Sequence, residues 1–403
     1  MDGEAAEIWI TGIGIISAAG CDLKQSTLTL QQGISPLKAA SLPYSVHNNK
    51  YVCGSVDLTN VQLSRMLGLS PDNTHNRTTL LALYAAQQAL AHAGIRPEDE
   101  EITLINATTV GGMSNTELSF DSINAKETRA DKTFIDEMDC GNIGRSMQSY
   151  FNIPGDHYTL STACSSGSNG IMLGARLIRS GKAGIVLAGG SDSLSKFVLN
   201  GFLSLKNVDP ALCKPFDNAR AGLNLGEGAA YFVLEEKCRA EARNAQPLAK
   251  ISGYNNISET YHMTGSSPDG EGAFKAMTGA ITMAGLSPHD ISFVHTHGTS
   301  TVDNDLAESA AIKKIFDGRV QFASSKTYTG HTLAASGCIS MALTITMMQN
   351  NFLFPSLNFA TPIEGPSLTP VTRIENNVRL EHCLINSFGF GGNNTSLLIS
   401  RVL

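Results

Sequence analysis

The feature that most constrains the fold of this 403-residue chain is a unit that occurs twice. Residues 80–108 read as an apolar helix, a Gly, a Pro and an apolar strand, and residues 273–296 repeat this order. Both copies contain the pattern Ala-Gly-Ile/Leu-x-Pro-x-Asp, at 93–99 and at 284–290. A Gly after a helix takes the left-handed conformation that ends it, and a following Pro prevents a restart. The matching order and composition predict two related halves.

Short apolar runs elsewhere read as strands. They lie near both ends of the chain and at 183–190, 229–236 and 248–254, while helical stretches follow Cys164, Asp303 and His331. This alternation predicts an α/β protein with mainly parallel sheets that helices cover on both faces. A charged segment at 237–248 separates the two copies. We therefore expect an N-terminal half at residues 1–247 and a C-terminal half at residues 248–403, packed as one compact body.

Charge and cysteine spacing argue against several classes of protein. The net charge of −7 and the pI near 5.8 argue against a broad nucleic-acid-binding surface. The N-terminus is acidic where a secretory signal is basic, and no apolar run reaches membrane-spanning length, so we expect a cytosolic protein without a membrane span. The eight cysteines form no CxxC pair. Residues 11–17 lack the third Gly of a dinucleotide fingerprint and read as a structural turn.

Cys164 differs from the other cysteines in its neighbours. It lies in the small-residue segment STACSSGS (161–168), where an extended stretch meets a helix. The start of a helix offers free N–H groups and a positive partial charge, which favour a thiolate and can hold an oxyanion. The segment therefore indicates a nucleophile, with a buried structural cysteine as the other reading.

Two further segments place histidines at strand ends. His295 and His297 alternate at the end of a predicted strand, so at most one of them faces a given site. His331 follows a Gly-containing loop near a helix start, where the helix dipole keeps the imidazole neutral. Lys326, five residues earlier, is either a site residue or a solvated loop lysine.

A fourth segment, NSFGFGGNN at 386–394, is either a hairpin packed by its rings or a mobile gate with free backbone N–H groups. Together the four segments place one cysteine and two histidines at strand ends of two related halves. Cys–His catalysis across the interface of the halves needs this arrangement.

The segments STACSSG, HGTST, KTYTGH and NSFGFGGNN, in this order, resemble the elongating β-ketoacyl-[acyl-carrier-protein] synthases of the thiolase superfamily. Residues 215–236 resemble another segment of that family, and the resemblance covers essentially the whole chain. It implies a thiolase-like, five-layered αβαβα fold made of two similar halves, usually as a homodimer.

The resemblance also implies roles for particular residues. Cys164 resembles the nucleophile that accepts the acyl group, and His297 and His331 resemble the pair that binds the malonyl thioester and promotes loss of CO2. Lys326 resembles the lysine that supports this pair, and Glu308 a supporting acid. The further implied positions are pantetheine contacts at Thr299 and Thr301, a gating loop with Phe388 and Phe390, an oxyanion hole from the amides of Cys164 and Phe390, and Val110 as a limit to the acyl pocket.

The implied activity is that of an acyltransferase, a 3-oxoacyl-[acyl-carrier-protein] synthase of fatty-acid elongation. It would condense malonyl-carrier protein with the cysteine-bound acyl chain, with no metal or organic cofactor, and its partners would be acyl- and malonyl-carrier proteins. Thiolases normally have a second cysteine in a C-terminal CxG context, and initiating synthases use Cys, His and Asn; neither pattern is found here.

Two departures keep other functions open. Residues 220–223 read Arg-Ala-Gly-Leu where the family commonly has Arg-Asp-Gly-Phe, and GFGGNN replaces the more usual GFGGTN. They favour, as an alternative, a ketosynthase of a specialised polyketide or aryl-polyene pathway, possible also as a heterodimer with a related subunit. A further alternative is a chain-length-factor-like subunit, which would lack the nucleophile, and Cys164 argues against it.

Overall fold

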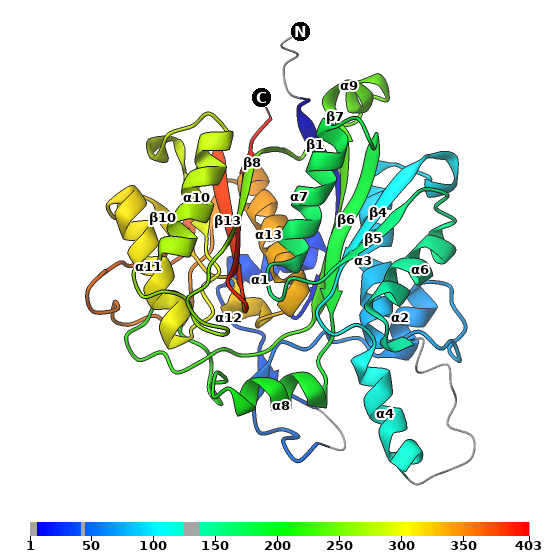
Figure 1. Cartoon of the computed structure of the whole chain (residues 1–403), viewed down its shortest axis with the longest axis horizontal. Coiled ribbons are helices and arrows are strands. Elements are labelled where there is room, and N and C mark those ends of the chain that lie inside the picture. The colour runs from blue at the N-terminus through cyan, green and yellow to red at the C-terminus, as the bar shows by residue number, and fades with distance from the viewer. Residues whose placement is uncertain (1–5, 42–44, 125–136, 403) are drawn as a thin grey trace.

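The computed structural model describes residues 6–41, 45–124 and 137–402 (Figure 1). Ten of its strands form one sheet in the order β10-β9-β13-β14-β8-β1-β7-β6-β4-β5. These strands are β1 (Ile8–Ser17), β4 (Ile102–Ala107), β5 (His157–Leu160), β6 (Ile185–Asp192), β7 (Gly228–Glu236), β8 (Ala249–Ser258), β9 (Phe293–His295), β10 (Gln321–Ala323), β13 (His382–Gly389) and β14 (Asn393–Ser400). The short strands β2 (Lys38–Ala39) and β3 (Val52–Cys53) form one pair, and β11 (Phe352–Leu353) and β12 (Glu375–Asn376) another.

The large sheet consists of two halves with the same topology. In the N-terminal half β5, β4 and β6 are parallel, and β7 and β1 continue antiparallel; in the C-terminal half β10, β9 and β13 are parallel, and β14 and β8 continue antiparallel. The halves join where β1 pairs with β8, from Ile8 opposite Ile251 to Ile10 opposite Ala249. This confirms that the chain is built from two related halves.

The expectation of mainly parallel sheets is wrong. Five strand pairings of the large sheet are antiparallel and four are parallel. All ten residues of β1 and all eight of β6 are buried. Helices cover both faces of antiparallel strands here as well, so their sequences are continuous apolar runs that do not reveal strand direction.

Helices complete five layers, which confirms the αβαβα architecture (Figure 1). Helices α3 (Arg77–Ala93) and α6 (Cys140–Phe151) cover the outer face of one half, and α10 (Glu271–Met283) and α11 (Val302–Phe316) cover that of the other. Helices α7 (Ser166–Arg179) and α13 (Ser336–Asn350) lie between the halves and contact each other. The other α-helices of the described residues are α1 (Leu23–Gln32), α2 (Asn60–Met66), α4 (Met113–Asn124), α8 (Lys196–Ser204), α9 (Lys237–Ala242) and α12 (Lys326–Thr329).

The repeated unit folds as its sequence predicts. Helix α3 ends at Gly94 with φ of 66°, and Gly285, with φ of 68°, follows α10. Each is followed by a short 3-10 helix, at Pro97–Asp99 and Pro288–Asp290, that leads into β4 or β9. Gly takes this left-handed conformation without the clash that a Cβ would cause.

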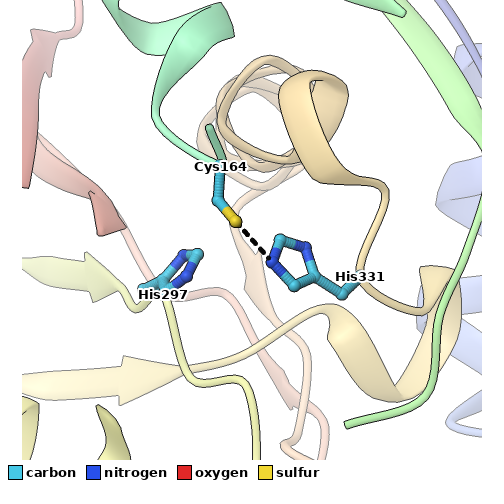
Figure 2. A group of neighbouring side chains, drawn as sticks. All are labelled: Cys164, His297 and His331. Atoms are coloured by element: carbon cyan, nitrogen blue, oxygen red, sulfur yellow. Dashed lines mark hydrogen bonds between the residues drawn. The ribbon is translucent and has the colours of Figure 1, made fainter. Parts of the chain in front are cut away.

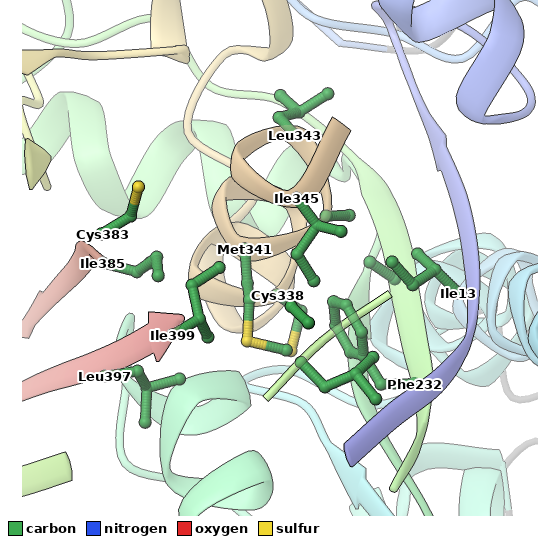
Figure 3. Close-up of a cluster of buried hydrophobic side chains, with 14 of the residues drawn as sticks. Ile13, Phe232, Cys338, Met341, Leu343, Ile345, Cys383, Ile385, Leu397 and Ile399 are labelled. Atoms are coloured by element: carbon green, nitrogen blue, oxygen red, sulfur yellow. The ribbon is translucent and has the colours of Figure 1, made fainter. Parts of the chain in front are cut away.

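The core lies around helix α13, which is buried on all sides over residues 336–348. An apolar helix of this kind packs against neighbours all round. Figure 3 shows Met341 and Ile345 of α13 with Phe232 of β7 and Ile385 and Ile399 of β13 and β14. One hydrophobic cluster therefore joins the two halves.

The segment that resembles a dinucleotide fingerprint is not a turn, contrary to expectation, because it lies inside β1. A Cβ on Gly12 would lie 2.2 Å from the carbonyl oxygen of Ala89, and one on Gly14 would lie 1.9 Å from that of Ala85. The two glycines thus allow helix α3 to contact the strand backbone directly. Within the described residues, no helix combines the length and apolar character needed to cross a membrane.

Candidate active site

Cys164 lies in a tight turn between β5 and helix α7. The preceding residue, Ala163, has φ of 53°, a left-handed conformation that is uncommon for a residue with a side chain. Gly389 packs over this turn, since a Cβ there would lie 2.8 Å from the Thr162 carbonyl oxygen and 3.3 Å from the Cys164 nitrogen. The thiol of Cys164 points toward His297 and His331 of the second half (Figure 2).

The structure brings Cys164 together with His297 and His331, all of them buried (Figure 2). The Sγ of Cys164 lies 3.1 Å from Nε2 of His331. The ring centroids of His297 and His331 are 5.3 Å apart, with the rings at 85°. The cysteine comes from the N-terminal half and both histidines from the C-terminal half, so the site straddles the seam between them.

His295, the alternating partner of His297, lies outside the site. It is buried, with Nδ1 2.8 Å from Oγ1 of Thr344 and Nε2 2.9 Å from Oγ of Ser325. Both ring nitrogens are satisfied, so His295 is a core residue. This agrees with the expectation that only one of the two histidines faces the site.

Burial dominates the ionisation of Cys164. It raises the pKa of the thiol to about 11, although the charge of Lys326 and the N–H groups of Phe390 and Cys164 act in the opposite direction. The sequence suggested a pKa lowered by the helix terminus, and for the free thiol this is wrong. Backbone N–H groups of both the cysteine turn and the Gly-rich hairpin thus lie close enough to the sulfur to lower its pKa.

Both histidines of the site are neutral. Burial lowers the pKa of His331 and of His297 well below the usual value, and the charge of Lys326 lowers both further. The sequence predicted a neutral His331 because of a helix dipole, but burial is the main cause of its lowered pKa. The Nδ1 atoms of His297 and His331 have no hydrogen-bond partner among the described residues.

Lys326 and Glu308 hold the backbone of His297 from two sides. The buried ammonium of Lys326 donates to the carbonyl oxygen of His297. The buried carboxylate of Glu308 accepts from the amides of His297 at 2.9 Å and Gly298 at 2.8 Å, and from Asn386 at 2.9 Å. Burial lowers the pKa of Lys326 to about 8 and raises that of Glu308. Lys326 is thus not a solvated loop lysine.

A pocket leads from the surface to Cys164. Its lining includes Thr299 and Thr301, whose hydroxyls are 2.8 Å apart, together with Phe388 and Phe390. The Gly-rich segment forms a hairpin in which Gly389 pairs with Asn393. Of the two readings of this segment, the structure contains the hairpin, and the gating role remains a prediction.

Val110 does not line this pocket. It is half-buried and packs against a separate apolar cluster. The members of this cluster include Leu194, Val198, Leu199 and Leu333. Leu223 belongs to this cluster and also lines the pocket. Val110 therefore lies behind the pocket wall.

Sequence reasoning missed Phe202 of helix α8. Its ring stacks on that of Phe390 at 5.7 Å and 28° and lies 6.5 Å from the ring of His331. Phe197, on the same helix, is 53% exposed. No sequence signal separates the two phenylalanines, because their difference depends on where the hairpin from the other half lies.

The site also has the donors of a metal site. Cys164, His297 and His331 offer ligand atoms that all lie within 4.8 Å of one another. Thiolate and imidazole are the donors that Zn²⁺ prefers. The neighbouring ammonium of Lys326 opposes a bound cation, so the geometry alone does not make this a metal centre.

Comparisons with known proteins agree with this geometry. The model of the beta-ketoacyl synthase N-terminal domain matches residues 5–240, and that of the C-terminal domain matches residues 248–360. The 3-oxoacyl-[acyl-carrier-protein] synthase 2 of Coxiella burnetii is 29% identical over 419 residues, with 99% of each chain covered.

Solved structures of ketosynthases are also similar to this chain. A beta-ketoacyl synthase from Burkholderia phymatum has a TM-score of 0.88 and 29% identity, covering 99% of this chain and 100% of that one. The ishigamide ketosynthase/chain length factor has a TM-score of 0.93 and 25% identity, with the same coverage. The chain therefore belongs to the β-ketoacyl synthase family, whose members are condensing acyltransferases with the thiolase-like fold.

Proposed function

We propose that this chain is a 3-oxoacyl-[acyl-carrier-protein] synthase that elongates an acyl chain with malonyl-carrier protein. The observation that carries this proposal is the contact of 3.1 Å between Cys164 Sγ and His331 Nε2, with His297 beside them at the end of one pocket. The name of the Coxiella burnetii relative supports the choice of a carrier-protein substrate.

In the first half-reaction the thiol of Cys164 attacks the thioester of an acyl-carrier protein. Neutral His331 takes the thiol proton through Nε2, because a thiol with a pKa near 11 needs a base at neutral pH. The amides of Cys164 and Phe390 stabilise the oxyanion. A sulfur–carbon bond forms at Cys164, the bond to the carrier breaks, and the carrier thiol leaves with the proton.

In the second half-reaction malonyl-carrier protein occupies the same pocket. The carbon–carbon bond to its carboxylate breaks, CO2 leaves, and the electron pair forms an enolate. Neutral His297 donates an N–H hydrogen bond to the enolate oxygen, and His331 does so in the tautomer that carries its proton on Nε2, whereas the tautomer protonated at Nδ1 accepts the thiol proton in the first half-reaction. The enolate carbon attacks the acyl-cysteine, and the thiolate of Cys164 is released and takes up a proton from solvent. Atoms and charge balance without a cofactor.

Lys326 and Glu308 act in this scheme as positioning residues. Their contacts to the backbone of His297 fix its ring, and the charge of the ammonium adds to burial in lowering the pKa of both rings. Thr299, Thr301, Phe388 and Phe390 line the pocket, where the two threonines would contact the pantetheine and the two phenylalanines would gate entry of the acyl chain. Val110, in the cluster that shares Leu223 with the pocket, would limit chain length.

The proposal extends to assembly and location. We divide the chain into halves at 1–247 and 248–403, expect a homodimer, and expect action in the cytosol, since all eight cysteines are free. Two observations favour a second candidate, a ketosynthase of a specialised polyketide or aryl-polyene pathway that pairs with a related subunit. The departing residues Ala221 and Leu223 line the pocket, and a ketosynthase/chain length factor is among the similar structures. A subunit of the chain-length-factor type is disfavoured because Cys164 is retained.

The deciding experiment presents the purified chain with malonyl-carrier protein and acyl-carrier proteins of graded length, including unsaturated and aryl primers. We expect 3-oxoacyl products with saturated primers and none with Cys164→Ala. Turnover only with aryl or polyene primers, or only beside a second subunit, would favour the second candidate. No condensation under any of these conditions would refute both.

A further inference from the structure

The side-chain oxygen of Asn393 is an acceptor shared by three segments near Cys164. Asn393 is the first residue of β14 and pairs with Gly389 across the hairpin. Its Oδ1 accepts from Oγ of Ser165 at 2.7 Å, from Nδ2 of Asn169 at 2.8 Å and from Nδ2 of Asn256 at 2.8 Å. These donors belong to the cysteine turn, helix α7 and strand β8.

Two of the donors have a second acceptor within reach, since Oγ of Ser165 lies 2.7 Å from the Thr162 carbonyl oxygen and Nδ2 of Asn256 lies 3.1 Å from Oδ1 of Asn169. The second proton of the Asn169 amide goes to Oγ1 of Thr162 at 2.8 Å, and that of the Asn256 amide goes to Oγ1 of Thr395 at 2.7 Å. The Thr395 hydroxyl in turn donates to Oδ1 of Asn169 at 2.8 Å. Loss of the Asn393 oxygen would therefore leave one amide proton of Asn169 with only a contact of 3.5 Å to Oγ of Ser165 and would move Ser165 and Asn256 to their second acceptors, which is costly in a partly buried network.

This network links the two backbone segments that supply the proposed oxyanion donors. Ser165 directly follows Cys164, and Gly389, the partner of Asn393, directly precedes Phe390. Only Phe390, Gly391 and Gly392 separate the paired residues, and both glycines have positive φ, of 82° and 78°. Asn393 thus anchors the far end of a short turn whose near end packs on the cysteine turn.

We propose that Asn393 is a positioning residue that holds the Phe390 amide in register with the Cys164 amide, so that both donate to one oxyanion. This inference rests on the proposed function, since the oxyanion forms only in acyl transfer. It assigns a role to the Asn that distinguishes GFGGNN in this chain from the more usual GFGGTN.

The test compares two reactions of Cys164 in Asn393→Leu, Asn393→Asp and wild type. Acyl transfer from an acyl-carrier protein creates an oxyanion, whereas alkylation by iodoacetamide creates none. We expect Asn393→Leu to slow single-turnover acylation by about tenfold to a hundredfold, because displacement of catalytic groups has effects of this size. Alkylation should change by less than about threefold, since it needs no oxyanion hole. Asn393→Asp keeps an acceptor oxygen and should restore most of the acylation rate.

Asn255→Leu is the matched control, because Asn255 neighbours Asn256 on β8 but donates to the carbonyl oxygen of Lys275 on helix α10. It should leave the ratio of acylation to alkylation unchanged. Equal slowing of both reactions in Asn393→Leu, or no rescue by Asp, would overturn the inference. If Asn393→Leu does not fold, Asn256→Ala, which removes one of the amide donors to Asn393 from a strand away from the cysteine turn, must lower the same ratio. Absence of acylation in wild type would instead refute the proposed function.

Discussion

At the scale of residues, the charge of Lys326 acts on the whole Cys–His site. Its ammonium lowers the pKa of Cys164, His297 and His331 together, and its own pKa is lowered to about 8 by burial. Its ammonium also donates to the carbonyl oxygen of His297, so we expect malonyl-carrier-protein decarboxylation to fall as the pH rises through about 8, where the ammonium loses its proton and this hydrogen bond weakens. The Lys326→Met variant should decarboxylate malonyl-carrier protein slowly at neutral pH, and its rate should not decline as the pH rises through about 8.

The stability of the fold should change in the opposite direction over the same range. The unfolded lysine, with a pKa of 10.5, binds more protons above pH 8 than the folded one. The contribution of Lys326 to the free energy of unfolding therefore rises with pH between about 8 and 10.5. Measurement of thermal unfolding and of decarboxylation over the same pH range separates the effect on stability from the effect on activity. A wild-type decarboxylation profile that stays flat from pH 7 to 10 would contradict the role given to Lys326.

The two histidines should differ in the half-reactions that they affect. His331 contacts the thiol of Cys164, and no such hydrogen bond is formed by His297 among the described residues. We expect His297→Ala to lower condensation by roughly 100- to 1000-fold and leave acylation of Cys164 largely intact. His331→Ala should impair both steps. Quench-flow acylation and product analysis measure them separately, and equal profiles for the two variants would be inconsistent with this geometry.

Alkylation of the wild-type protein by iodoacetamide needs a control for cysteines other than Cys164. Cys238 is exposed, whereas Cys164 is buried with a raised pKa. Alkylation should therefore be followed by peptide mapping in a Cys238→Ser background, with the partly exposed Cys21 and Cys140 quantified separately from Cys164.

At the scale of elements, the contact between helices α7 and α13 depends on Gly337. A Cβ there would lie 2.1 Å from Oγ of Ser168 and 2.4 Å from Oγ of Ser387, which are hydrogen-bonded to each other at 2.8 Å. Gly337→Ala should thus destabilise the fold by about 1–3 kcal/mol. Gly201→Ala in helix α8, where no atom lies within 4 Å of the new Cβ, should stabilise it by about 0.5–1 kcal/mol.

Denaturant unfolding of the two Gly variants measures the difference. The loss in Gly337→Ala should shrink in a Ser168→Ala background, because the closest clashing atom is then absent. An undiminished loss would show that the Ser168 hydroxyl does not limit the contact, which leaves Oγ of Ser387, 2.4 Å from the new Cβ, as the limiting atom.

Helix α8 and its neighbours should set acyl length through Val110. Val110 packs near Val198 and Leu199 in the cluster behind the pocket, so Val110→Phe should shorten the longest acyl chain that is accepted. Each excluded methylene forfeits about 0.8 kcal/mol of burial. Val61→Phe, on the exposed face of helix α2, is the control. A length profile that is identical in wild type and Val110→Phe would show that the acyl chain runs elsewhere.

Elements whose signals are local were predictable from the sequence. The Gly and Pro that end α3 and α10, the strands that follow, and the hairpin at 389–393 all depend on neighbouring residues. The direction of the strands was not predictable from the sequence, because fully buried strands lack the alternation of polar and apolar residues that would mark antiparallel pairs. Phe202 and the Asn393 network were also missed, since both depend on contacts between residues about 190–230 positions apart in the chain.

At the scale of the whole molecule, the two halves share one core and one site. A single hydrophobic cluster contains Ile10 of β1, Ile171 of α7, Ile345 of α13 and Ile399 of β14. Cys164 and the histidines come from opposite sides of the same seam. Separate unfolding of either half would expose this cluster and leave the polar network around Asn393 without partners.

We therefore expect the halves to unfold in one cooperative transition, although a chain of this length often unfolds in steps. In scanning calorimetry, the calorimetric and van't Hoff enthalpies per cooperative unit should agree, and Gly337→Ala should shift the whole transition because its site lies at the seam. Measurements at several protein concentrations separate this effect from dissociation of a dimer, which makes the midpoint concentration-dependent. Two resolved transitions, with only one moved by Gly337→Ala, would show that the proposed halves at 1–247 and 248–403 are independent folding units.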